Sequence, residues 1–174
     1  AFIDETDLPV TMRSHLRDRP VVLVPVFYRC PMLCTQVLST LLRAVNQQEL
    51  VPGKDFEVVV FSIDPRETPA LASEKKLHYL HREAMPRSRG GWHFLTGGAS
   101  ETARLTGAIG YRFSYDERTD QFAHPAAIAV LTPDGTISRY LIGLDYRPGD
   151  LKLALDEAGR GAIGSLVDKF VLRC

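Results

Sequence analysis

Two runs of mostly apolar residues, rich in β-branched side chains, constrain the fold of this chain more than any other feature. The first covers residues 21–27 (VVLVPVF) and the second covers residues 56–63 (FEVVVFSI). Strands with so little polar alternation are typical of a sheet that is covered on both faces. Each run is followed by apolar residues at helical spacing, so the sequence predicts an α/β protein built on a central sheet.

The rest of the chain continues this alternation and then changes to antiparallel hairpins. Thr68 and Pro69 have the residue types expected at the cap and first position of a helix. The order of elements predicts a thioredoxin-like, three-layer sandwich with an inserted hairpin and an extra C-terminal segment. Beyond the two runs, the predicted helices cover residues 35–45, 69–83, 100–107 and 151–158, and the predicted strands cover 92–96, 111–115, 121–123, 126–131 and 137–142.

Length and charge set the boundaries of what this chain can do. Its 174 residues suit one domain, predicted over 7–158, followed by a C-terminal extension over 159–174 that we expect to be truncated. The formal net charge is zero, which gives no electrostatic reason to expect binding to nucleic acid or to an anionic membrane surface. The chain begins at Ala1, so a removed signal peptide or membrane anchor is compatible with it.

Cys30 and Cys34 lie between the first apolar run and the helix predicted after it. Ligands of open α/β sheets gather at the carboxyl ends of strands, and a helix N-terminus is expected to favour a thiolate. Thiolates suit Cu(I), and zinc also accepts them. The three intervening residues differ from the two of common dithiol motifs, which favours metal binding over rapid thiol exchange without excluding either. A plain structural pair or a disulfide is the alternative.

Two thiolates leave a copper ion short of ligands, so a third one is expected. His124 is the best candidate of five histidines, because it ends a polar loop directly before a predicted buried strand. In the thioredoxin arrangement this loop packs against the cysteine loop. The other four have solvated or structural roles as their simpler interpretation: His15, His78, His81 and His93.

Four segments together resemble the Sco/SenC copper chaperones, over roughly residues 7–158 and in the order found in that family. They are PVVLVPVFYRCPMLCT at 20–35, FSIDPRETP at 61–69, WHFLTG at 92–97, and His124 followed by AIAVLTPDG at 127–135.

The resemblance implies a thioredoxin fold that carries Cu(I) or Cu(II) on Cys30, Cys34 and His124. It also implies a role in building the binuclear copper site of cytochrome c oxidase, on the periplasmic side of the bacterial inner membrane, tethered or soluble. The expected partner is the oxidase's copper-bearing subunit or another copper chaperone. Asp64 matches the acidic residue of the family's Asp-Pro motif near the metal loop, and capping the helix at Pro69 is its simpler alternative role.

The chain departs from the family pattern at Pro125 and in the segment after Gly161, which extends past the compact family domain. Pro125 stands where thioredoxins place a proline beside their cysteines, and a cis bond there would aim His124 or its carbonyl at the loop. A thiol-disulfide reductase acting on the oxidase subunit is therefore the main alternative, with Cys30 attacking and Cys34 resolving. A copper or redox sensor is a third hypothesis, and peroxide reduction is weaker. Cys174 is expected to belong to a part of the chain beyond the truncation.

Overall fold

The computed structural model describes residues 1–16, 18–30, 33–82 and 89–163, and its centre is a five-stranded mixed sheet. The strand order is β5-β4-β3-β8-β9, with β3, β4 and β5 parallel and with β8 antiparallel to both of its neighbours. The predicted α/β class and thioredoxin-like architecture are confirmed. The bounds of the strands are β3 Val21–Val26, β4 Glu57–Ser62, β5 Trp92–Leu95, β8 Ala127–Leu131 and β9 Ile137–Ile142.

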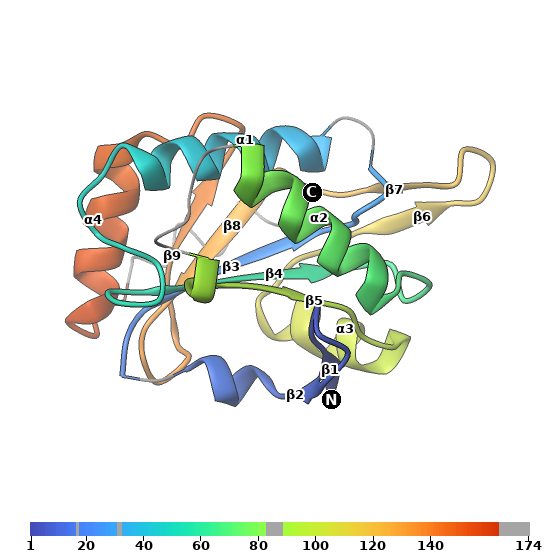
Figure 1. Ribbon diagram of the computed structural model, residues 1–174, viewed down its shortest axis with the longest axis horizontal. Coiled ribbons are helices and arrows are strands. Elements are labelled where there is room, and N and C mark those ends of the chain that lie inside the picture. The colour runs from blue at the N-terminus through green and yellow to red at the C-terminus, as the bar shows by residue number, and fades with distance from the viewer. Residues whose placement is uncertain (17, 31–32, 83–88, 164–174) are drawn as a thin grey trace.

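Helices cover both faces of this sheet. Figure 1 shows α1, α2 and α4 on one side of it, and α3 with the N-terminal segment on the other. Two successive crossovers in one direction, β3-α1-β4 and β4-α2-β5, place α1 and α2 on the same face when both are right-handed. Thr68 Oγ1 accepts a hydrogen bond from the Leu71 N–H at 3.4 Å, and α2 begins at Pro69, both as predicted. The helices are α1 Leu33–Asn46, α2 Pro69–Arg82, α3 Ala99–Ala108 and α4 Pro148–Gly159.

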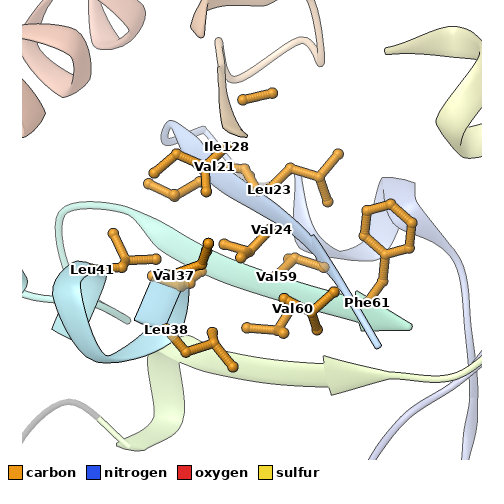
Figure 2. Packing of buried hydrophobic residues seen from close by; sticks show 14 of the residues in the cluster. Val21, Leu23, Val24, Val37, Leu38, Leu41, Val59, Val60, Phe61 and Ile128 are labelled. Carbon is orange, nitrogen blue, oxygen red and sulfur yellow. The ribbon is translucent and has the colours of Figure 1, made fainter. Parts of the chain in front are cut away.

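The core lies on both faces of the two central strands, because neither strand has a polar face. Leu38 and Leu41 of α1 pack against the face that carries Val24, whereas Leu23 and Phe61 project from the opposite face (Figure 2). All five side chains are at most 2% exposed. Burying each contributes about 1.5–3 kcal/mol, so this packing holds the carboxyl ends of β3 and β4 at fixed positions.

The first residues of the chain join the same core, which the sequence analysis did not predict. A short strand β1 (Phe2–Ile3) pairs antiparallel with β2 (Pro9–Val10), and Ile3 also bridges to Thr96 after β5. Phe2 is 5% exposed, and its ring packs edge-on against Phe61 with a centroid separation of 6.1 Å. Residues before the predicted boundary at residue 7 therefore stabilise the sheet. The described residues also include short 3-10 helices, η1 at Met12–His15 and η2 at Arg89–Gly91.

The inserted hairpin is present and lies at the end of the sheet that carries the cysteines. It consists of β6 (Ser114–Asp116) and β7 (Gln121–Ala123), which pair antiparallel and project outward in Figure 1. None of the helices in the described part of the chain has both the length and the apolar character needed to cross a bilayer. Cys174 and most of the predicted C-terminal extension lie outside the described residues.

Candidate metal centre

Cys30 and Cys34 lie where β3 passes into α1, at the carboxyl end of the strand. Both are buried, and within the described residues neither forms a disulfide. Cys34 stands in the first turn of α1, and its backbone N–H donates to Cys30 Sγ at 3.5 Å. The Phe27 N–H donates to Cys34 Sγ at 3.4 Å. Cys30 is 9% exposed and Cys34 is 3% exposed, so Cys30 is the more exposed of the two residues.

His124 directly follows β7, and its ring reaches the cysteine loop. The distance from His124 Nε2 to Cys34 Sγ is 3.3 Å, across a sequence separation of 90 residues. The other histidines have different surroundings. The rings of His15 and His93 are tilted against each other with centroids 4.4 Å apart, His78 lies edge-on to Tyr79, and His81 lies 3.4 Å from an Arg89 nitrogen. His93 also contacts Glu57 at 3.1 Å.

A hydroxyl group that the sequence analysis did not single out orients the His124 ring. Tyr111 is 4% exposed, and its hydroxyl lies 2.8 Å from His124 Nδ1 while donating to the Pro125 carbonyl at 2.8 Å. His124 Nδ1 also lies 3.0 Å from that carbonyl, which can only accept. Nδ1 therefore carries the proton, and Nε2 presents its lone pair to Cys34. Metal-binding histidines are commonly held in this way through their second nitrogen.

The Cys34 thiol is protonated in this arrangement. Its pKa is raised well above the ordinary value, first by the hydrogen bond with Cys30 and then by burial, against the lowering effect of the Phe27 N–H. The expectation that the helix N-terminus would favour a thiolate is therefore wrong for Cys34, because burial beside a second thiol outweighs the first turn of α1. A metal ion must displace this proton when it binds.

Glu67 supports the loop that carries Cys30, and the sequence analysis missed it. The Glu67 carboxylate is 5% exposed and accepts the backbone N–H groups of Tyr28 at 2.7 Å and Arg29 at 2.8 Å. It also accepts the Ser62 hydroxyl at 2.6 Å. Burial is the first cause that raises the pKa of this carboxyl. Glu67 thus joins the turn after β4 to the cysteine loop.

Asp64 is buried at the same turn, but it does not cap α2. Arg66 Nε donates a hydrogen bond to Asp64 Oδ1 at 2.8 Å, and Arg66 Nη2 donates one to Oδ2 at 2.8 Å. The carboxylate also accepts a hydrogen bond from the Arg66 backbone N–H. The capping role is therefore wrong, because Thr68 supplies the cap and the Asp64 carboxylate faces a guanidinium. Asp64 is 2% exposed. No cis peptide bond occurs among the described residues, so the His124–Pro125 bond is trans.

The donor set suits a soft metal ion. Two ligands on one ion, with bonds of about 2.0–2.3 Å, lie about 3.5 Å apart, close to the observed 3.3 Å between His124 Nε2 and Cys34 Sγ. Within the described ranges, however, no group of three or more His, Cys, Asp and Glu side chains is arranged to hold a metal as it stands. A three-ligand site that includes Cys30 therefore requires local rearrangement, and residues 31–32 between the cysteines lie outside the described chain.

Known proteins resemble this chain in sequence and in fold. A Stutzerimonas stutzeri protein described as "Putative copper-binding protein" is 26% identical over 144 residues, and the match spans 80% of this chain and 66% of that protein's length. The crystal structure of Arabidopsis thaliana ScoI with copper bound has a TM-score of 0.72 at 19% identity, covering 92% of this chain and 95% of ScoI. BsSco, a member of the Sco family of cytochrome c oxidase assembly proteins studied for a disulfide switch, has a TM-score of 0.65 at 22% identity, covering 91% and 90%.

The family model described as SCO1/SenC matches residues 1–152. This range includes both cysteines of the loop, the turn with Asp64 and Glu67, and His124. It covers most of the 174 residues. The chain therefore belongs to the SCO1/SenC family.

Proposed function

We propose that this chain binds one copper ion through Cys30, Cys34 and His124 and delivers it to the copper-bearing subunit of cytochrome c oxidase. The observation that carries the proposal is the distance of 3.3 Å between His124 Nε2 and Cys34 Sγ. Cys30 Sγ lies next to this pair, because it accepts a hydrogen bond from the Cys34 N–H. The copper-bound ScoI structure and the name of the Stutzerimonas relative support the choice of metal. The oxidase role of the family supports the acceptor.

The chemistry of the donors agrees with transfer of copper as cargo. Thiolates and imidazole are soft or intermediate ligands that hold Cu(I) with low coordination, so an acceptor's cysteines can replace them one at a time. His124 is the ligand best placed to leave, because it is half-buried on the segment after an exposed hairpin. The two cysteines are joined more directly, because the Cys34 N–H donates a hydrogen bond to Cys30 Sγ.

A titration tests this proposal. Reduced protein is titrated with Cu(I) in competition with a chromophoric chelator, alongside the His124→Ala variant and the control His78→Ala on the exposed side of α2. We expect one equivalent bound by the wild type and by His78→Ala, and a large loss of affinity in His124→Ala. If the wild type binds Cu(I) no more tightly than the micromolar range, the proposal is refuted.

The setting of this function is also a proposal. We place the chain on the periplasmic side of the inner membrane, where an oxidase copper subunit would meet it, with a tether outside the residues described. Localisation of the full-length protein by protease protection in spheroplasts tests this, since a cytoplasmic protein would be protected.

Thiol-disulfide reduction of the acceptor's cysteines is a second candidate. It is favoured by two thiols that hydrogen-bond to each other and are not joined in a disulfide, with Cys30 the more exposed residue and so the better placed to attack. The disulfide switch named for BsSco supports it. Measuring the reduction potential of the Cys30–Cys34 couple distinguishes the two functions. If this couple is more oxidising than the acceptor's disulfide, it cannot reduce that disulfide, and the reductase function is refuted.

A further inference from the structure

The β6–β7 hairpin, which leads into His124, has little core of its own. All three residues of β6 are exposed, and in β7 only Phe122 is half-buried. Small elements with few buried contacts belong to the least stable parts of a fold and open locally. Because Ala123 ends β7 and His124 follows it, the position of this hairpin sets where the His124 backbone enters the metal centre.

One side chain joins this hairpin to the turn after β4 through charge and ring contacts. Arg66 forms a salt bridge with the buried Asp64 carboxylate. Its Nη1 also contacts two groups of the hairpin, Tyr115 Oη at 3.0 Å and Asp120 Oδ1 at 2.9 Å. Tyr115 in turn donates to Asp120 at 2.7 Å. The guanidinium also lies 4.8 Å from the centre of the Tyr115 ring and 5.9 Å from that of Phe122.

An aromatic contact continues this linkage to the metal centre. The ring of Phe122 lies 5.3 Å from that of Phe27, centroid to centroid, and Phe27 lies edge-on to His124 at 6.1 Å. Phe27 is also the residue whose N–H donates to Cys34 Sγ. The hairpin is therefore seated against the cysteine loop by Phe122 and secured at its outer side by Arg66.

We propose that Arg66 is a positioning residue for the metal centre: by holding the β6–β7 hairpin to the turn after β4, it keeps His124 beside Cys34. The expected effect of Arg66 on copper affinity rests on the proposed function, whereas its attachment of the hairpin to the turn after β4 does not. Arg66 acts through the hairpin and His124, so its removal weakens the contribution of His124 and leaves that of the cysteines unchanged.

The contacts of Arg66 with Asp64, Tyr115 and Asp120 are called the clamp below. The expected loss of copper affinity follows from the environment of these contacts. An isolated exposed ion pair contributes little, and Asp120 is 69% exposed at its side chain. Here, however, the guanidinium is fixed on a buried carboxylate with fork geometry, and planar pairing of this kind is stronger. Outer partners of metal-binding histidines change metal affinity by about 10–100-fold. Because Arg66 acts one step further out, we expect about a tenfold loss.

The test compares variants that remove the clamp from either side. Arg66→Gln removes the guanidinium, whereas Asp120→Asn removes only the negative charge at one of the two hairpin groups that Arg66 contacts, at an exposed site, which leaves Asp64 paired and the fold intact. Arg118→Gln is the matched control, since Arg118 lies on the same hairpin but pairs only loosely with Asp116 at 3.7 Å. Cu(I) affinity is measured in the wild-type and His124→Ala backgrounds, and amide hydrogen exchange of residues 121–124 is measured without metal.

We expect Arg66→Gln to lose about tenfold in copper affinity, Asp120→Asn somewhat less, and Arg118→Gln nothing, with each effect vanishing in the His124→Ala background. Amide exchange over 121–124 should rise about tenfold in Arg66→Gln and stay unchanged in Arg118→Gln. An equal loss of affinity with and without His124 would overturn the proposal, as would unchanged affinity in a wild type that binds copper. If the wild type binds no copper, the exchange result decides: unchanged exchange in Arg66→Gln and Asp120→Asn overturns the anchoring.

Discussion

Replacing Tyr111 with Phe removes the hydroxyl that orients His124 while keeping the buried ring. The variant loses a 2.8 Å hydrogen bond to the Pro125 carbonyl and the 2.8 Å contact with His124 Nδ1. Each hydrogen bond contributes about 0.5–1.5 kcal/mol net. His124 Nδ1 keeps the Pro125 carbonyl at 3.0 Å, so one partner survives. We expect the free energy of unfolding to fall by about 1–2 kcal/mol and copper affinity to fall by about 10–100-fold.

Urea unfolding and competitive Cu(I) titration measure the two effects of Tyr111→Phe separately. Tyr140→Phe is the matched control, because the Tyr140 hydroxyl is buried and donates to the Ile109 carbonyl at 2.8 Å without contacting His124. The control should lose stability to a similar degree and keep its copper affinity. The reasoning would be refuted by equal losses of copper affinity in both variants, or by wild-type affinity in Tyr111→Phe.

Three further predictions concern the support of the cysteine loop and the core. Near neutral pH, Glu67→Gln should lower the free energy of unfolding by about 1.5–3 kcal/mol, because an amide NH₂ then faces one of the donors that the carboxylate accepts; urea unfolding measures this, and an unchanged midpoint would contradict it. Burial raises the pKa of Glu67 above 4.5, so folding favours the protonated carboxyl. The stability that this group contributes is therefore present below about pH 4.5 and is lost as pH rises through the raised pKa. Over the same rise in pH, the difference in unfolding free energy between the wild type and Glu67→Gln should shrink. Leu41→Ala should cost about 2–5 kcal/mol of stability by chemical unfolding while leaving one copper bound per chain, since Leu41 is fully buried away from the loop.

The sheet and its covering helices were predictable because their signals are local. The mostly apolar, β-branched runs at 21–27 and 56–63 are typical of strands buried on both faces, and they are β3 and β4. Thr68 and Pro69 mark the start of α2 through their own chemistry. By contrast, the Phe2 strand has two residues, too few for any periodicity, and its place depends on a distant contact with Phe61.

The surroundings of the candidate site were less predictable than its ligands. Cys30 and Cys34 follow a strand and open a helix, which is a local pattern, whereas Tyr111 and Glu67 act through contacts across 13 and 38 or more residues. Glu67 stands beside Asp64, so the sequence offered two acidic residues and no reason to prefer the one whose carboxylate reaches the cysteine loop. The raised pKa of Cys34 was not predicted, because the hydrogen bond with Cys30 and the burial of the thiol depend on packing that a helix position does not reveal.

X-ray absorption of the copper-loaded protein tests the central claim most directly, because it counts the atoms bonded to the metal. The account predicts two sulfur ligands and one nitrogen ligand in the wild type. It predicts loss of the nitrogen alone in His124→Ala, and of one sulfur in either Cys30→Ser or Cys34→Ser. A copper environment in the wild type without nitrogen, or one that His124→Ala leaves unchanged, would contradict the three-ligand centre.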